Sequence, residues 1–165
     1  MQDDVFVRDS TPSWYRLSRV EADGEVVVVR DKPLHHVFGL TYDGTSLYWI
    51  ELSGGVSPTV SQTHFELWRA PYTRDIAALN SSAELVVALD GTFNYGYSMV
   101  HDGVFATSIA KEALVIRLSD KRVKTLPAAA DVSAGAFYVD RNDLWVSYET
   151  TKPVAAHYAK VTIDW

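Results

Sequence analysis

Three segments of the chain alternate between apolar and polar residues, bend at an aspartate, and then alternate again. They are Leu40–Leu52 (LTYDGTSLYWIEL), Met99–Ile109 (MVHDGVFATSI) and Phe137–Glu149 (FYVDRNDLWVSYE). Alternation is the period of a half-buried strand, so a short polar bend between two such runs predicts an antiparallel hairpin. The two-residue Asp102-Gly103 loop suits a type I′ turn, in which both residues have positive φ. The four-residue bend of the third segment, DRND, suits a type I turn.

A second kind of strand pair is expected between these hairpins. At the C-terminus only the first strand of such a pair is expected. A further strand is expected at Asp4–Asp9, whereas residues 74–79 favour at most one helical turn. The expected strand order is therefore three, four, four and three, in sets that recur roughly every 40–50 residues. The pairs are Ser13–Val20 with Glu25–Arg30, Phe65–Tyr72 with Ala83–Leu89, and Ala113–Asp120 with Val123–Pro127, and the half pair is His157–Trp165.

Four short antiparallel strands repeated at this period are typical of a β-propeller, in which each set forms one blade. The segments DGTSLYWIEL, FELWRAPY and HDGVFATSIAKEALVIRLSDKRVKTL resemble propellers of the TolB, NHL and YWTD type. The resemblance covers nearly the whole chain and implies an all-β repeat protein with a partial blade at 1–30, blades at 34–90 and 91–129, and a partial blade at 130–165. A β-barrel or β-sandwich is the alternative, because both are also built from short strands and tight turns.

Three to three and a half blades are fewer than a propeller needs to close its ring. An open arc would expose apolar sheet faces and unpaired strand edges. We therefore expect one of three arrangements. A homodimer joined head to tail would supply 28 strands, enough for seven blades of four; a complementary propeller half would supply the remainder; or the chain closes alone as a small propeller or barrel.

Composition and charge narrow the function classes. The formal net charge of −6 offers no basic surface for a phosphate backbone, so we expect neither nucleic acid nor an anionic membrane as a partner. The absence of cysteine excludes disulfides, thiolate catalysis and cysteine-ligated metals. We expect no membrane span, and the first ten residues lack the features of a signal peptide, which leaves both an exported mature form and a cytoplasmic protein open.

Candidate ligand-binding residues follow from the resemblance, because the first strand of each propeller blade lines the central channel. His36, Asn94 and Asp131 precede three such strands, and together they would suit a hard divalent cation such as calcium with water. The alternative for these residues is an ordinary loop or turn position. His64 and His157 start strands away from any expected channel, so no chemistry is assigned to them.

Aromatic residues suggest a second binding surface. Tyr95 and Tyr97 alternate with glycine in GTFNYGYS, which is typical of an adaptable contact loop, although packing between blades is the alternative. Four tryptophans within strands are expected in the core: Trp14, Trp49, Trp68 and Trp145.

The sequence thus favours a non-catalytic binding or scaffold module that meets its ligand at the channel mouth or the loop face. A propeller hydrolase or lactonase with a channel-bound divalent cation is the first alternative, and a structural half that assembles into a closed ring is the second. No catalytic residue and no cofactor is assigned, and the GxSxG motif of serine hydrolases is absent from the sequence.

Overall fold

The computed structural model describes residues 5–10, 14–55, 62–93, 97–109, 112–127, 132–140, 142–151 and 154–165. These residues form fourteen strands and one short helix, which confirms the all-β class. The strands make four antiparallel sheets of three, four, four and three strands, as the sequence predicts. The chain divides into two compact units, Met1–Phe93 and Asn94–Trp165, which are described in turn.

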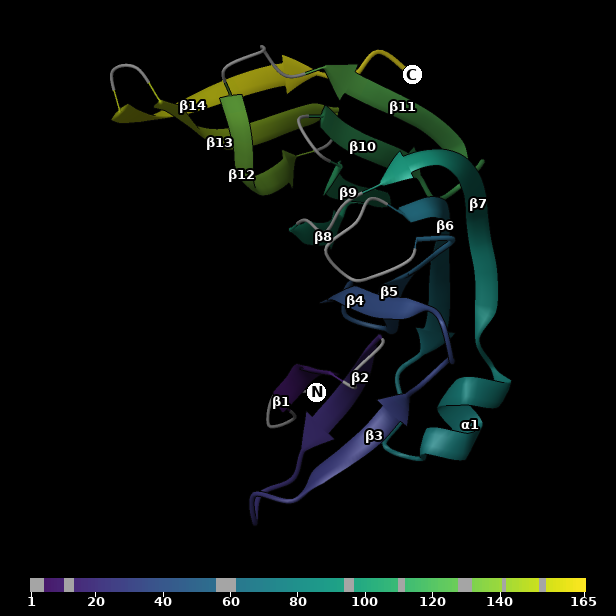
Figure 1. Ribbon diagram of the computed structural model, residues 1–165. Coiled ribbons are helices and arrows are strands. Elements are labelled where there is room, and N and C mark those ends of the chain that lie inside the picture. Colours follow the sequence, from purple (N-terminus) through teal and green to yellow (C-terminus); the bar gives the residue numbers. More distant parts are fainter. Residues whose placement is uncertain are drawn as a thin grey trace. The chain divides into compact units, whose positions relative to one another are not determined.

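The first unit contains a three-stranded and a four-stranded sheet, and in both each strand pairs with its neighbour in the chain (Figure 1). The one described helix, α1 (Ile76–Ser81), has Asp75 as its N-cap. It overlaps residues 74–79, where the sequence favours at most one helical turn. No helix in the described ranges has the length and apolar character needed to cross a membrane. The three-stranded sheet is β1 (Val5–Ser10), β2 (Tyr15–Val20) and β3 (Val26–Arg30), and the four-stranded sheet is β4 (His36–Tyr42), β5 (Ser46–Ser53), β6 (Gln62–Pro71) and β7 (Glu84–Phe93).

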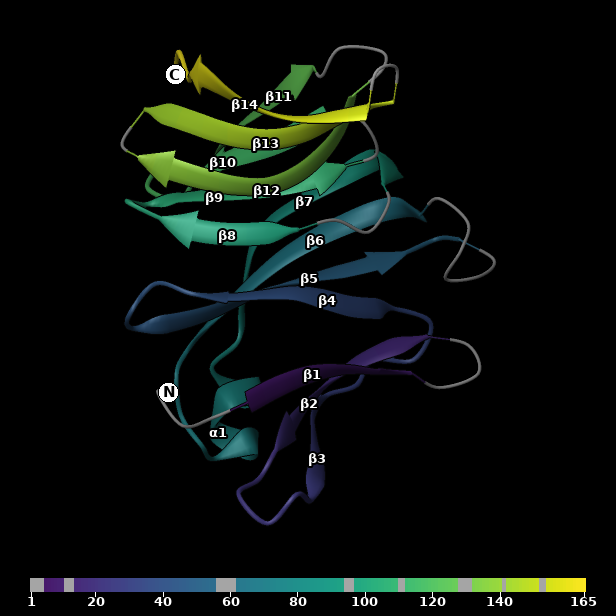
Figure 2. The same ribbon diagram turned by 90° about the vertical axis from the view of Figure 1, so that its left-hand side faces the viewer.

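The second unit repeats this plan in the opposite order (Figure 2). Its four-stranded sheet is β8 (Ser98–His101), β9 (Val104–Ile109), β10 (Glu112–Arg117) and β11 (Arg122–Pro127), and its three-stranded sheet is β12 (Val132–Asp140), β13 (Asp143–Thr151) and β14 (Val154–Thr162).

The three predicted hairpins are confirmed as β4–β5, β8–β9 and β12–β13. Asp102 and Gly103 have φ of 48° and 73°, as a type I′ turn requires. In the β4–β5 turn, the Asp43 carboxylate accepts hydrogen bonds from the backbone N–H groups of Thr45 and Ser46, at 2.9 and 2.8 Å. The expected four-residue loop of the third hairpin is wrong, because Asp140 and Asp143 already pair in the ladder.

Each unit has its own hydrophobic core. The first is formed by Leu17 and Val29 of the three-stranded sheet together with residues of the four-stranded sheet, including Val37, Leu47 and Trp49. Trp68, which is partly buried, packs against this core from β6, so both tryptophans contribute to the core as predicted. The second core contains Val104, Ala106, Ala113, Val115, Val139, Leu144 and Ile163.

The predicted core burial of Trp145 is wrong, and Trp14 is a partly buried residue outside the core, with its indole N–H donating to Asp31 Oδ1 at 2.7 Å. The Trp145 side chain lies on β13, where the residue is 42% exposed. Lys160, its cross-strand neighbour on β14, holds its ammonium 5.8 Å from the centre of the indole ring. Trp145 therefore lies on the face of the three-stranded sheet opposite to Leu144, since alternate residues of a strand point to opposite faces.

Candidate functional site

Two acidic residues and two tryptophans face each other across β5 and β6. The register pairs Trp49 with Trp68 and Glu51 with Glu66. Because alternate residues of a strand share a face, all four lie on one side of the sheet. Each indole N–H donates to the carboxylate two residues away on its own strand, Trp49 to Glu51 and Trp68 to Glu66, both at 3.0 Å. Carboxylates placed directly opposite one another repel, so this arrangement requires cations nearby.

Arg30, at the end of β3, supplies one of these cations. Its Nε donates to Glu51 Oε1 at 2.8 Å, and its Nη1 donates to Asn80 Oδ1 at 3.0 Å. The guanidinium also lies over the rings of Trp49 and Trp68, 5.7 and 5.3 Å from their centres. The Glu51 side chain is completely buried, and Arg30 is the charge partner of its Oε1 atom.

Lys32, in the segment between β3 and β4, lies between the two carboxylates. Its Nζ is 3.1 Å from Glu51 Oε2 and 3.2 Å from Glu66 Oε2. Only the contact with Glu66 has the alignment of a hydrogen bond, so Glu51 Oε2 is a buried oxygen in an ion pair but without a hydrogen bond. The ammonium therefore marks a position at which the site accepts positive charge.

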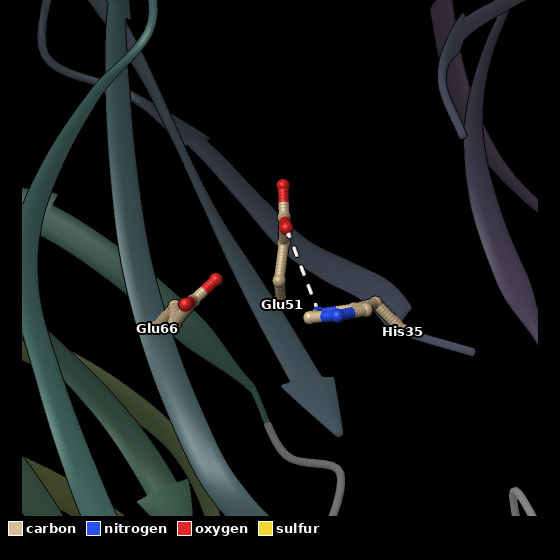
Figure 3. A group of neighbouring side chains, drawn as sticks. All are labelled: His35, Glu51 and Glu66. Carbon is tan, nitrogen blue, oxygen red and sulfur yellow. Dashed lines mark ion pairs between the residues drawn. The ribbon is translucent and has the colours of Figure 1, made fainter. Parts of the chain in front are cut away.

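His35 lies beside the two carboxylates, and Figure 3 shows its side chain with those of Glu51 and Glu66. Its Nδ1 points to Glu51 Oε2 at 3.9 Å, and it is also a buried atom without a hydrogen bond. Burial and the nearby charge of Lys32 lower the pKa of His35. Burial alone would raise the pKa of Glu66, but hydrogen bonds from Trp68 and Lys32 outweigh it and hold that pKa below its usual value. We name the four residues Lys32, His35, Glu51 and Glu66 the Glu–Glu cluster.

A second polar row lies one step along the same strands, where His64 of β6 pairs with Asp90 of β7. His64 Nδ1 is 2.8 Å from Asp90 Oδ1, and His64 Nε2 is 3.4 Å from Glu66 Oε1. The hydrogen bond to Asp90 raises the pKa of His64, although partial burial opposes it. His64, to which sequence reasoning assigned no chemistry, is thus connected to the Glu–Glu cluster.

This row predicts how His64 titrates. In an NMR titration the His64 imidazole is expected to protonate above the ordinary histidine pKa of about 6.5, and Asp90→Asn is expected to lower that pKa. The protonated form stabilises the fold below the unfolded-state pKa, and the contribution disappears as the pH rises through the folded-state pKa. Asp23→Asn, in the turn between β2 and β3, is the control. An unchanged His64 pKa in Asp90→Asn would contradict the assignment.

Of the five residues predicted as ligand contacts from the sequence, the structure describes His36, in the first unit, and Tyr97, in the second. His36 is only 2% exposed, its Nδ1 accepts a hydrogen bond from the Tyr15 backbone N–H at 3.2 Å, and its ring packs edge-on against Tyr15. Tyr97 is exposed, and its backbone N–H donates to Ser108 Oγ. Asn94, Tyr95 and Asp131 lie outside the described residues. The ligand roles of all five stay predictions.

The Glu–Glu cluster was missed because its members are ordinary when read singly. A signal is nevertheless present: Trp-x-Glu in LYWIEL is followed by Glu-x-Trp in FELWR. Antiparallel pairing of these two segments places tryptophan opposite tryptophan and glutamate opposite glutamate. Two carboxylates and an imidazole around one ammonium have the chemistry of a cation-binding site. The same groups also have the chemistry of a structural ion-pair network.

Comparisons with known proteins place the fold. No protein-family model matches the chain, and no curated protein matches it in sequence. Among solved structures, one of two prolyl endopeptidases analysed for inter-domain dynamics in catalysis and specificity is similar to it, with a TM-score of 0.52 and 13% identity. The match covers 96% of this chain and 24% of that chain, so this chain spans about a quarter of that protein's length. Prolyl endopeptidase has a β-propeller domain, and the likeness therefore shows that this chain has a propeller-like all-β fold.

Proposed function

We propose that the chain is an incomplete β-propeller with blades of the TolB, NHL and YWTD type, and that it acts as a binding or scaffold module once its ring is closed. The observation that carries this proposal is the series of four meandering antiparallel sheets, similar over nearly the whole chain to part of a propeller-containing protein. In this proposal the two four-stranded sheets are complete blades, and the terminal sheets are partial ones.

Exposed apolar side chains support an incomplete ring. Six of the nine large hydrophobic residues exposed in the described ranges belong to the two three-stranded sheets, although these sheets contain fewer strands than the inner two. A blade at the end of an open arc lacks the neighbour that would cover its outer face. The six are Val26 and Val28 on β3, Tyr138 on β12, Trp145 on β13, and Tyr158 and Val161 on β14. Val161 is the exception among them, because it pairs with Leu144 and therefore lies on the core side of its sheet.

A second copy of the chain is the partner we propose. Each junction of a head-to-tail homodimer would place the last three-stranded sheet of one copy beside the first three-stranded sheet of the other. Since each chain has four sheets, the ring would contain eight sheets, in place of the seven blades of four that the strand total suggests. A complementary propeller half or further blades of a longer polypeptide would cover the same faces.

Light scattering across a dilution series tests this proposal. We expect the mass of a dimer at micromolar concentration, and we expect Trp145→Glu to shift it towards the monomer. The matched control is Leu85→Glu on β7, because Leu85 is 40% exposed against 42% for Trp145 but lies on an inner sheet. The proposal would be contradicted if the unmodified chain had the mass of a monomer at micromolar concentration and melted cooperatively.

The non-catalytic reading is preferred to a hydrolase with a channel-bound cation. The hydrolase reading needs His36 at the channel, and the burial of that residue against Tyr15 favours a structural role instead. Addition of calcium in a thermal melt is accordingly expected to leave the melting temperature unchanged. A calcium-dependent rise in melting temperature that His36→Gln abolishes would favour the hydrolase.

A further inference from the structure

The Glu–Glu cluster contains two unsatisfied buried atoms that face each other. Three buried side-chain atoms lack a hydrogen bond in the described residues, and two of them are His35 Nδ1 and Glu51 Oε2. Their separation of 3.9 Å is too long for a hydrogen bond. Buried polar atoms without a partner are uncommon in folded proteins, and each one needs an explanation such as an unseen water or ion. Here the two atoms lie 3.9 Å apart, so a single bound species between them would satisfy both.

The distances between these ligand atoms suit a metal ion. Ligand atoms bound to one zinc ion at about 2.0–2.2 Å lie at most about 4.4 Å apart. The 3.9 Å between His35 Nδ1 and Glu51 Oε2 falls within this limit, and one ligand atom from each of His35, Glu51 and Glu66 lies within 4.8 Å of the other two. Small side-chain rotations are therefore enough to bring all three onto one ion. The backbone pairing of Glu51 with Glu66 fixes two of the three ligands on adjacent strands.

The charges identify the species as a cation. Two directly opposed carboxylates, one of them fully buried, attract positive charge, and the Lys32 ammonium already lies 3.1 and 3.2 Å from them. Lys32 is partly exposed, at 34% of its side chain, so its ammonium can swing out to water and leave this position free. Arg30 remains on Glu51 Oε1 and leaves Oε2 as the ligand atom.

We propose that His35, Glu51 and Glu66 form a binding site for a divalent transition-metal ion, which enters in exchange for the ammonium of Lys32. One imidazole and two carboxylates match Zn²⁺ or Mn²⁺ better than calcium, which prefers an all-oxygen shell. Lys32 is the built-in competitor of the metal. The site lies within the first unit, so it is independent of how the ring is closed.

Calorimetric titration of the full chain with Zn²⁺, after treatment with a chelator, tests the site. Lys32→Met removes the competing charge and is expected to tighten the dissociation constant by roughly 10-fold or more, because two unit charges about 4 Å apart near a protein surface interact strongly enough to account for such a factor. Glu66→Gln and Glu51→Gln remove ligands and are expected to weaken binding by more than that amount. Glu84→Gln is the matched control, because Glu84 is an exposed, ion-paired glutamate of the same sheet.

Two further measurements keep the proposal falsifiable. Asp90→Asn is expected to leave Zn²⁺ affinity unchanged, because Asp90 pairs with His64 and contacts none of the three proposed ligands, whereas loss of binding in that variant would assign the metal to the His64–Asp90 row instead. Mn²⁺ is expected to broaden the NMR signals of the His35 imidazole before those of His101, a signature that a folding defect does not produce. Failure of both the unmodified chain and Lys32→Met to bind Zn²⁺ at millimolar concentration would overturn the proposal.

Discussion

Arg30→Ala is expected to lower the free energy of unfolding by about 3–5 kcal/mol, the range found when one partner of a buried ion pair is removed. The variant leaves the carboxylate of Glu51 completely buried without its hydrogen-bonded charge partner. It also removes the guanidinium from the faces of Trp49 and Trp68. Urea denaturation followed by tryptophan fluorescence measures the loss.

Arg69→Ala is the matched control for Arg30→Ala. Arg69 forms an ion pair with Glu84 on the same sheet, but both side chains are exposed, so its loss is expected to cost less than about 1 kcal/mol. The double variant Arg30→Ala/Glu51→Gln is expected to recover part of the stability, because it removes the buried negative charge that Arg30→Ala leaves without its partner. Equal losses for Arg30→Ala and Arg69→Ala would contradict the importance of the buried pair.

Leu144→Ala is expected to destabilise the second unit by about 2–5 kcal/mol, the usual cost of truncating a buried leucine. Leu144 of β13 is fully buried in the core that the three-stranded sheet shares with β9 and β10. The cavity would lie where β13 contacts the other strands of this unit. Hydrogen exchange measured by NMR locates the loss, since it is expected to fall on amides of the second unit.

Val161→Ala provides the comparison for Leu144→Ala. Val161 is the cross-strand neighbour of Leu144 on β14 but is 37% exposed, so its truncation is expected to cost well under the buried value. A loss in Leu144→Ala no larger than that in Val161→Ala would mean that the β12–β14 sheet contributes little to this core.

Most of the strand order was predictable, because each hairpin carries its signal locally. Asp102-Gly103 takes the two positive φ angles that its sequence favours, and Asp43 holds its turn with side-chain hydrogen bonds to the next backbone N–H groups. These signals act over a few residues, so one sequence is enough to read them.

The candidate site was not predictable in the same way, because it depends on register and on a connecting segment. Glu51 and Glu66 lie on different strands, and only their exact pairing makes them opposed. Lys32 and His35 come from the segment between β3 and β4. The alternation of apolar and polar residues within the strands does not specify the path of this segment. Of the two adjacent histidines, sequence reasoning chose His36, whereas His35 is the one that faces the carboxylates.

Trp145 failed as a core prediction for a different physical reason. Tryptophan in a strand is normally buried, and the rule assumes that both faces of the sheet are covered. The β12–β14 sheet places Leu144 towards its core and Trp145 on the other side, and a pattern of alternation cannot tell which face has a neighbour.

The strictly sequential pairing of strands has a consequence for how the chain acquires its structure. Every described ladder joins strands that are neighbours in the chain, and no described sheet contains a crossover. Loop closure over such short distances costs little conformational entropy, so each sheet can nucleate on its own hairpin as soon as that stretch leaves the ribosome. Synthesis and folding can thus proceed together, one meander after another, before the C-terminal residues have been translated.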